Sequence, residues 1–235
     1  MPARCKITLL FDVVSPYTLF AFQVLRRYQR IWTQCEFIYE PCFLGGIMKQ
    51  SGNVPPATNP YKGGYLFKDI ARVSQAFDIG FPLGIPDEFP SNSLNIMRLL
   101  RVVKELENEA VLLDLSFDYW KAYWGDNQPL SSPETLARVL RARVGASKAE
   151  EYIQLSKTAK FKDQLVAVTK AATEQYGAFG MPWIIVEQEG REPESFFGSD
   201  RFETMAIRLG LPWHGPLGQG PNTANASGSA FSTKL

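Results

Sequence analysis

The chain has 235 residues, 45% of them hydrophobic and 21% charged, which is enough for one large globular domain or two interlocked ones. Its 25 basic and 24 acidic residues leave a formal net charge of +1, so charge does not indicate nucleic acid, an anionic membrane or a polyanion as a partner. A single histidine, His214, cannot assemble the usual His/Cys zinc sites, and no stretch approaches the ~20 apolar residues of a membrane span, so we expect neither a metal site nor a membrane segment.

The first sixty residues predict a βαβ unit followed by a loop. Residues 7–11 form an apolar run of strand length, and Ser15-Pro16 follow it, where proline suits the first turn of a helix. Apolar residues recur with a helical period over 17–32, and 35–41 is a second strand candidate. The stretch 45–64 is rich in glycine and proline, which predicts a long irregular loop of the kind that is often functional.

The rest of the chain predicts a block of helices and then a return to strands. Strands are expected over 181–186 and 194–197, and a last helix over 200–209. This order predicts an α/β fold: a thioredoxin-like sheet, opened after its second strand by a large inserted helical domain. The expected helices of the block are 69–77, 94–106, 110–124, 133–144 and 148–173.

These patterns predict three regions. We place a discontinuous thioredoxin-like domain at 1–62 and 174–217 and the inserted α-helical domain at 63–173. Residues 218–235 are rich in small polar residues and lack a periodic apolar face, so we expect a disordered C-terminal tail.

The cysteines favour a reducing environment. Cys5, Cys35 and Cys42 are too few and too oddly numbered for a disulfide framework, and no two of them form Cys-x-x-Cys. We expect all three to be small buried hydrophobic residues. The first residues leave no room for a signal peptide, so the protein is expected to be soluble and intracellular.

Ser15 is the first candidate for chemistry. It stands at the start of the first helix, where unpaired backbone N–H groups and the helix dipole favour an anion. The run from Ser15 to Thr18 keeps the spacing of a redox Cys-x-x-Cys motif with oxygen at both ends, which excludes disulfide exchange. A serine hydroxyl can still donate to the sulfur of a bound thiol and favour its thiolate. The alternative is that Ser15 only caps the helix.

Two further segments could hold a ligand. A cis Met181–Pro182 bond would explain a proline at the entry to a central strand and would present the Met181 backbone as a docking edge for a peptide. The alternative is an ordinary trans proline. Ser199 and Asp200 stand at the start of the last helix, where they could cap it, bind the carboxylate and the ammonium of one ligand group, or do both.

Two residues of the loop after the second strand complete the candidate site. Asn53 or Lys62 could reach the far end of a bound tripeptide, and the alternative for Lys62 is a solvated side chain.

Four segments, in order from about residue 6 to residue 217, resemble the kappa class of glutathione transferases. They are 12–17, 46–56, 176–182 and 197–201. The resemblance implies a DsbA-like fold, a homodimer, and glutathione as co-substrate beside Ser15, which corresponds to the catalytic serine. The positions at which the family contacts glutathione are Ser15, Asn53, Lys62, Met181, Pro182, Ser199 and Asp200.

The resemblance also implies an activity. The glutathione thiolate would attack a small electrophile or reduce a hydroperoxide, which is a detoxification reaction. Two alternatives remain open: a glutathione-dependent isomerase of the 2-hydroxychromene-2-carboxylate type, and a non-catalytic DsbA-like binding protein. Kappa enzymes occur in mitochondria and peroxisomes, and Thr233-Lys234-Leu235 approximates a peroxisomal address, so we expect one of these compartments, with the cytoplasm as an alternative.

Overall fold

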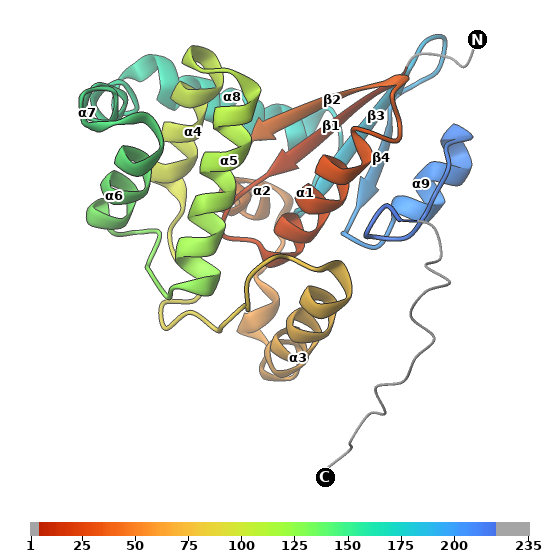
Figure 1. Cartoon of the computed structure of the whole chain (residues 1–235), viewed down its shortest axis with the longest axis horizontal. Coiled ribbons are helices and arrows are strands. Elements are labelled where there is room, and N and C mark those ends of the chain that lie inside the picture. The colour runs from red at the N-terminus through yellow and green to blue at the C-terminus, as the bar shows by residue number, and fades with distance from the viewer. Residues whose placement is uncertain (1–4, 220–235) are drawn as a thin grey trace.

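The computed structural model describes residues 5–219, and in this part of the chain four strands form one mixed sheet in the order β2-β1-β3-β4 (Figure 1). β1 (Cys5–Phe11) runs parallel to β2 (Cys35–Pro41) and antiparallel to β3 (Trp183–Gln188). β4 (Glu194–Phe197) pairs antiparallel with β3 and forms the other edge. The predicted α/β sheet, opened after its second strand by helices, is therefore confirmed.

The connections around β1 and β2 contain more helix than expected. α1 (Pro16–Tyr28) follows β1, with Ser15 as its N-cap and proline at its first position. The expected loop over 45–64 is wrong in most of its length, because α2 (Leu44–Ser51), a 3-10 turn (Pro56–Thr58) and the start of α3 (Pro60–Phe77) lie there.

A close helix contact explains one glycine of α2, Gly46. A Cβ atom on Gly46 would lie 2.7 Å from Cγ2 of Thr169 in α8 (Ala159–Glu174), so the glycine lets the two helices approach. The sequence pattern does not distinguish a glycine needed for such an approach from a glycine needed for a turn.

The helical insertion lies between β2 and β3. The end of α5 continues into a π-helical turn (Lys121–Gly125). The single helix expected over 148–173 is wrong, because Ser156 and Thr158 donate their hydroxyls to carbonyl oxygens one turn back, at 2.8 and 2.7 Å, and interrupt the helix there. The helices of this region other than α8 are α4 (Leu94–Leu106), α5 (Glu109–Trp120), α6 (Pro133–Val144) and α7 (Ala146–Leu155).

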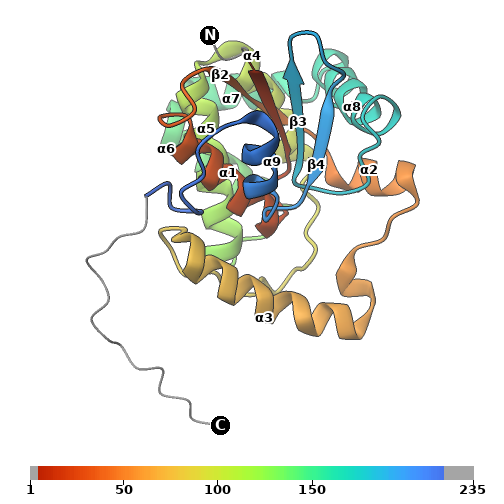
Figure 2. The same ribbon diagram turned by 90° about the vertical axis from the view of Figure 1, so that its right-hand side faces the viewer.

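The sheet is covered on both faces. α1 and α9 (Phe202–Leu209) lie on one face, and α2 and α8 lie on the other (Figures 1 and 2). Successive side chains of β1 point to opposite faces of the sheet. Leu9 packs in the hydrophobic core on the side of α1 and α9, and Leu10 packs in the smaller core on the side of α2 and α8.

Buried aromatic rings join the insertion to the sheet. The Trp120 ring of α5 lies 5.7 Å from Phe11 of β1 and 4.9 Å from Phe22 of α1, centroid to centroid. The sheet and the inserted helices thus share one core. Whether 63–173 is a domain of its own stays a prediction, and the predicted tail lies, from residue 220 on, outside the described residues.

The expectation for the cysteines is wrong in part. Cys5 and Cys35 are opposite each other in the β1–β2 register, with their Cα atoms 4.7 Å apart, and they form a disulfide. Cys42 is a buried free thiol, as expected. The sequence could not show the bridge, because it follows from the pairing of two strands whose cysteines lie 30 residues apart. The bridge also removes the support that the cysteines gave to a reducing compartment.

Within residues 5–219, no helix is both long and apolar enough to cross a bilayer.

Candidate functional site

The strand register gathers the candidate segments at one end of the sheet. β1 and β2 both end there, since Phe11 pairs with Pro41. β3 begins there, because Trp183 pairs with Leu10, and β4 ends there, because Phe197 pairs with Trp183. Ser15, Met181–Pro182 and Ser199–Asp200 therefore leave the sheet at the same edge, and α3 crosses below this edge (Figure 2).

The Ser15 hydroxyl is positioned to donate a hydrogen bond. Its Oγ accepts the backbone N–H of Thr18 at 3.2 Å, and the side chain is 6% exposed. The hydroxyl proton has no acceptor within the described residues. Proline at the first helical position removes one N–H, and the N–H of Tyr17 has no partner in this part of the chain, so it faces the same end of α1. Ser15 is thus both a cap and a free donor, and the two alternatives are compatible.

Asp12 holds the turn that carries Ser15. Its buried carboxylate accepts bonds from the N–H of Val14 at 3.1 Å, the N–H of Leu44 at 2.9 Å and the hydroxyl of Ser93 at 2.9 Å. Burial raises the pKa of Asp12 to about 6, while these three hydrogen bonds act in the opposite direction. One carboxylate therefore ties the β1–α1 turn to the start of α2 and to the segment before α4.

The Met181–Pro182 bond is cis, so of the two alternatives left open by the sequence the ordinary trans proline is wrong. The N–H and C=O of Met181 make no hydrogen bond with any residue between 5 and 219, although Gly198 N–H donates to Pro182 O at 3.2 Å on the adjacent strand. The Met181 backbone is thus an unused strand edge at the site, which fits the docking edge predicted for a peptide.

Asn53 stabilises the segment before the cis bond. Its side-chain Nδ2 donates to the carbonyl of Phe179 at 2.7 Å, and its Oδ1 accepts the N–H of Val54 at 2.8 Å. The structure therefore brings Asn53 to the site across the sheet edge, from the connection between α2 and α3.

Ser199 and Asp200 lie in a turn before the last helix, and not in it as expected. α9 begins at Phe202, and Arg201 is its N-cap residue with no side-chain capping bond, so neither predicted residue caps it. Ser199 is 6% exposed. Asp200 is exposed and pairs with Arg201 at 2.7 Å. Gly198 has φ +106°, a conformation that other residues rarely adopt, and it directs this turn.

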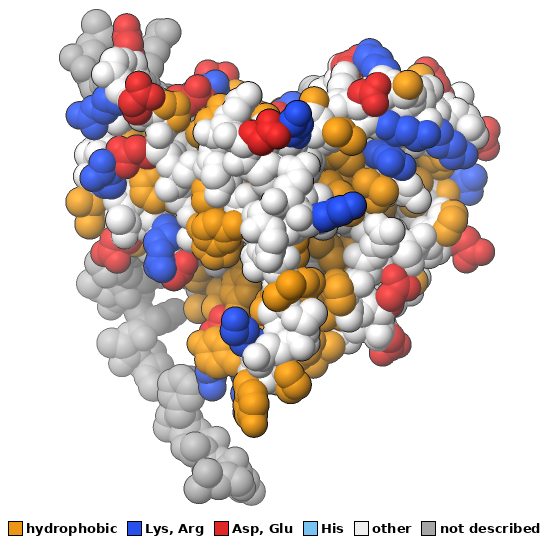
Figure 3. All heavy atoms as spheres, turned by 180° about the vertical axis from the view of Figure 1, so that it is seen from behind, with side chains coloured by type: hydrophobic (Ala, Val, Ile, Leu, Met, Phe, Trp, Pro, Cys, Tyr) orange, Lys and Arg blue, Asp and Glu red, His pale blue; other side chains and the backbone are white. Residues whose placement is uncertain are grey.

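An apolar pocket of about 410 Å³ opens beside Tyr17, between α1 and α3. Lys62 lies in the first turn of α3, not in a loop as expected, and its ammonium pairs with no carboxylate of residues 5–219. Hydrophobic side chains cover much of the surface at the bottom of the molecule, where α3 lies (Figure 3). The pocket is lined by Tyr17, Pro56, Tyr61, Lys62, Tyr65 and Leu66.

The hydroxyl of Tyr17 is already in use. It donates to Asp69 at 2.6 Å, and Tyr65 donates to the other oxygen of the same carboxylate at 3.2 Å. Burial, the bond to Asp69 and the negative charges of Asp69 and Asp200 hold the pKa of Tyr17 well above its usual value. Tyr17 stays neutral, and its proton is directed away from any ligand at Ser15.

The site therefore offers four groups to a ligand: the free hydroxyl of Ser15 at a helix N-terminus, the unpaired backbone of Met181, the carboxylate of Asp200 and the ammonium of Lys62. The apolar pocket beside Tyr17 adjoins them. Such a set can orient a peptide and stabilise an anion. No group of three or more His, Cys, Asp or Glu side chains that could hold a metal occurs in residues 5–219.

Sequence reasoning missed three supports of this site. They are Asp12 with Ser93, the Tyr17–Asp69 pair, and Trp120, whose indole Nε1 donates to the Ser15 carbonyl at 3.0 Å. Only Asp12 gave a local signal, an acidic residue directly after an apolar strand. The other contacts join segments far apart in the chain.

Comparisons with known proteins agree with this geometry. Residues 6–210 match the family described as DSBA-like thioredoxin domain. Kappa 1 glutathione S-transferases from Rattus norvegicus and Homo sapiens are 35% and 36% identical to the chain over 231 residues, covering 96% of this chain and 98% of each relative. The solved structure of 2-hydroxychromene-2-carboxylate isomerase aligns with a TM-score of 0.69 and 22% identity, over 87% of this chain and 94% of that one. The expected DsbA-like thioredoxin fold is therefore confirmed.

Proposed function

Because the chain belongs to the DsbA-like thioredoxin family and, within it, to the kappa-class glutathione transferases, we propose that it activates glutathione as a thiolate for attack on small electrophiles. Conjugation to an electrophile or reduction of a hydroperoxide would make it a detoxification enzyme. Glutathione serves as co-substrate.

The observation that carries this proposal is the state of Ser15. Its oxygen accepts the Thr18 N–H, its proton has no acceptor among residues 5–219, and the Ser15 side chain is nearly closed to water. A free thiol has a pKa near ~8.5, so most of it is protonated at neutral pH. A hydrogen bond from Ser15 and the field of the α1 N-terminus both favour the thiolate over the thiol. The attacking atom is the sulfur of glutathione. Ser15 donates a hydrogen bond to that sulfur and is not itself a nucleophile.

The remaining residues suit the rest of the tripeptide. The Met181 N–H and C=O would pair with the glutathione backbone beside Pro182, as an added strand would. Ser199 and Asp200 would bind the γ-glutamyl group, with Asp200 on its ammonium. Lys62 would neutralise the glycyl carboxylate, and Asn53 would keep the Phe179–Met181 segment in place.

The apolar pocket beside Tyr17 would take the electrophile. Its wall contains three tyrosine rings and Leu66, which favours flat, apolar substrates such as activated aryl halides. The neutral Tyr17 phenol would contribute surface and not charge.

The test is a titration of the thiolate absorbance of bound glutathione in wild type, Ser15→Ala and Tyr17→Phe. Wild type should ionise the thiol at lower pH than free glutathione, and Ser15→Ala should lose most of that shift and most of the conjugation rate. Tyr17→Phe is the matched control: it also removes one hydroxyl, but one that is donated to Asp69, so the thiolate pKa should stay as in wild type. An unchanged titration in Ser15→Ala would remove Ser15 from the mechanism.

The two alternatives differ in what happens to glutathione. An isomerase would regenerate glutathione, whereas a transferase consumes it, so product analysis separates them. A non-catalytic binding protein would show no glutathione binding by calorimetry and would bind unfolded peptides instead.

Assembly and location remain proposals. Family membership supports a homodimer, which sedimentation analysis would test. The Thr233-Lys234-Leu235 end supports a peroxisome, and the family supports a mitochondrion as the other compartment. These three residues lie outside the described part of the chain, and fractionation of cells with and without them would test their role.

A further inference from the structure

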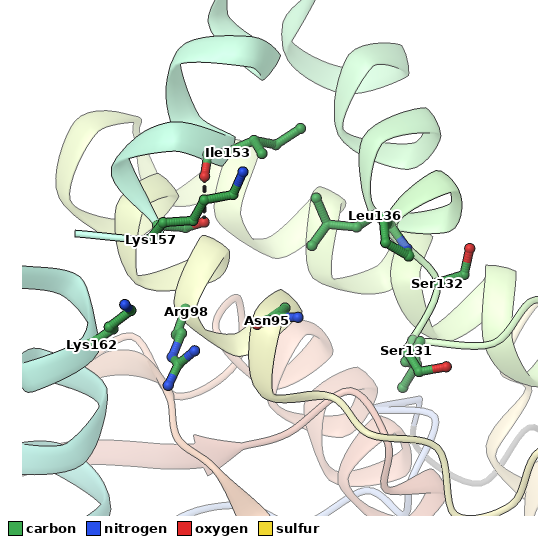
Figure 4. Close-up of a pocket in the computed structure, with 11 residues that line it drawn as sticks. Asn95, Arg98, Ser131, Ser132, Leu136, Ile153, Lys157 and Lys162 are labelled. Carbon is green, nitrogen blue, oxygen red and sulfur yellow. Dashed lines mark hydrogen bonds between the residues drawn. The ribbon is translucent and has the colours of Figure 1, made fainter. Parts of the chain in front are cut away.

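A second cavity, of about 330 Å³, lies among the inserted helices and shares no lining residue with the pocket beside Tyr17. Its wall comes from α4, the segment before α6, α6 itself, α7 and the α7–α8 connection, with Lys162 from the first turn of α8 (Figure 4). The break between α7 and α8 puts Ser156 and Lys157 in the wall.

The cavity has a cationic side without counter-charges. Arg98, Lys157 and Lys162 line it, and none of them forms an ion pair with a residue in the range 5–219, while the lining contains no carboxylate. Figure 4 shows these three residues on one side of the pocket and Ser131 and Ser132 on the other. Three unneutralised cations around one hollow create a positive potential there.

One of these cations also has an unsatisfied buried atom. Nε of Arg98 is inaccessible to solvent and has no hydrogen-bond partner among residues 5–219. Buried polar groups in folded proteins are nearly always paired, because an unpaired donor loses its bonds to water and gains nothing in return. Nε itself is closed off from the cavity, but the terminal nitrogens of the same guanidinium make no hydrogen bond or ion pair with residues 5–219, and Arg98 lines the cavity. A guanidinium suits an anionic oxygen well.

The rest of the wall is apolar. Leu130, Leu136 and Ile153 provide a hydrophobic surface next to the charged side. A volume of about 330 Å³ is near the lower limit of ligand pockets, which range over about 300–1,000 Å³. The occupant must therefore be compact, apolar over most of its surface and negatively charged at one end.

We infer that this cavity is a binding site for a small organic anion, distinct from the glutathione site. The carboxylate, sulfonate or phosphate head lies toward Arg98, Lys157 and Lys162, and the apolar body packs on Leu136 and Ile153. The inference does not depend on the proposed transferase function, because no residue of the Ser15 site takes part in it.

The test uses calorimetry with 2-naphthalenesulfonate and its neutral analogue 2-naphthalenemethanol on the full chain. The double variant Lys157→Gln/Lys162→Gln should bind the sulfonate roughly tenfold more weakly than wild type, while its affinity for the neutral analogue stays the same. Both lysines are exposed, so the variant should fold. Lys68→Gln, an exposed lysine on α3 outside the cavity, is the matched control and should bind like wild type.

A second variant separates this cavity from the pocket beside Tyr17. Ile153→Trp fills the cavity and should abolish the charge-sensitive sulfonate site without changing the glutathione affinity. Equal sulfonate binding by wild type, the double lysine variant and Ile153→Trp would overturn the inference, as would a loss in Lys68→Gln of the same size.

Discussion

The indole Nε1 of Trp120 donates a hydrogen bond of 3.0 Å to the carbonyl oxygen of Ser15, across 105 residues of sequence. The same carbonyl accepts the N–H of Leu19 at 3.2 Å as the first bond of α1. Trp120 is fully buried between the sheet and α1, so the inserted helices hold the backbone of the proposed catalytic residue in place.

Trp120→Phe should therefore affect catalysis as well as stability. Phenylalanine keeps the aromatic packing but loses the donor and some volume, and we expect the free energy of unfolding to fall by about 2 kcal/mol. The Ser15 carbonyl gains freedom, so kcat for conjugation should fall more than KM for glutathione rises. Urea unfolding and steady-state kinetics measure the two effects.

Trp124→Phe is the control for this change. Trp124 is equally buried in the π-helical turn, but its Nε1 has no hydrogen-bond partner in the described part of the chain, so the variant loses volume without losing a hydrogen bond. Similar kinetic losses in both variants would show that the Trp120–Ser15 bond does not position the serine.

Asp200→Asn should weaken glutathione binding through the γ-glutamyl ammonium. We expect a rise of about tenfold in Kd, since one charge-assisted contact is lost. N-acetylglutathione, which lacks the ammonium, should bind Asp200→Asn and wild type about equally. Arg201→Met removes only the ion-pair partner that Asp200 has in this structure, and it should not weaken glutathione binding. The assignment fails if Asp200→Asn lowers the affinity for both ligands by the same factor.

Asp12→Asn should change how stability depends on pH. The pKa of Asp12 is raised from 3.8 to about 6 by burial, so the folded state binds its proton more tightly than the unfolded state. The contribution of this group to stability is therefore present below about pH 4 and is lost as the pH rises to about 6, by about 3 kcal/mol in all. Urea unfolding of Asp12→Asn over this range should lack that decrease.

An exposed aspartate gives the comparison for Asp12. Asp163→Asn, on the surface of α8, should keep the wild-type pH profile. If Asp12→Asn also keeps the wild-type pH profile of stability, the prediction is wrong, and the Asp12 carboxylate has an ordinary pKa in the folded protein.

Local patterns predicted much of this fold. β2 and α4 begin and end at the expected residues, because alternating or periodic apolar residues and clear breakers mark both elements. Ser15-Pro16 likewise marked the start of α1, since a cap followed by proline is a local signal. The residues of the candidate site that belong to such junctions were therefore visible in the sequence.

The features that were missed depend on tertiary contacts. The carboxylate of Asp12 meets Ser93 across 81 positions, and Cys5 meets Cys35 only because their strands pair in one register. Gly46 was assigned to a loop because its packing partner, Thr169, lies more than a hundred residues away. A single sequence contains no signal for such pairs.

The Cys5–Cys35 bridge should stabilise the sheet. It closes a loop with a sequence separation of 30, which corresponds to about 3–4 kcal/mol in the chain-entropy description. Reduction should therefore lower Tm by up to about 10 °C. The Cys5→Ser/Cys35→Ser variant should melt at one temperature with or without reductant, and a wild type that is equally insensitive would show that the bridge adds no stability.

Gly46→Ala should destabilise the protein through α2. The new Cβ would lie 2.7 Å from Cγ2 of Thr169, a distance at which one helix must move, and we expect a loss of about 1–3 kcal/mol in unfolding free energy. Gly64→Ala, in α3, meets nothing within 4 Å and should be neutral or slightly stabilising, because alanine favours a helix.

A second substitution should rescue Gly46→Ala. Thr169→Ser removes Cγ2 but keeps the hydroxyl that accepts Phe43 N–H at 3.2 Å and donates to Leu165 O at 2.7 Å. The double variant should thus be more stable than the sum of the single effects predicts, by about 1 kcal/mol or more in a double-mutant cycle. Since α2 leads into the segment that places Asn53 against Phe179, the rescue should also restore glutathione affinity. Strictly additive effects in the cycle would mean that the chain relaxes elsewhere and that the α2–α8 approach does not set the position of Asn53.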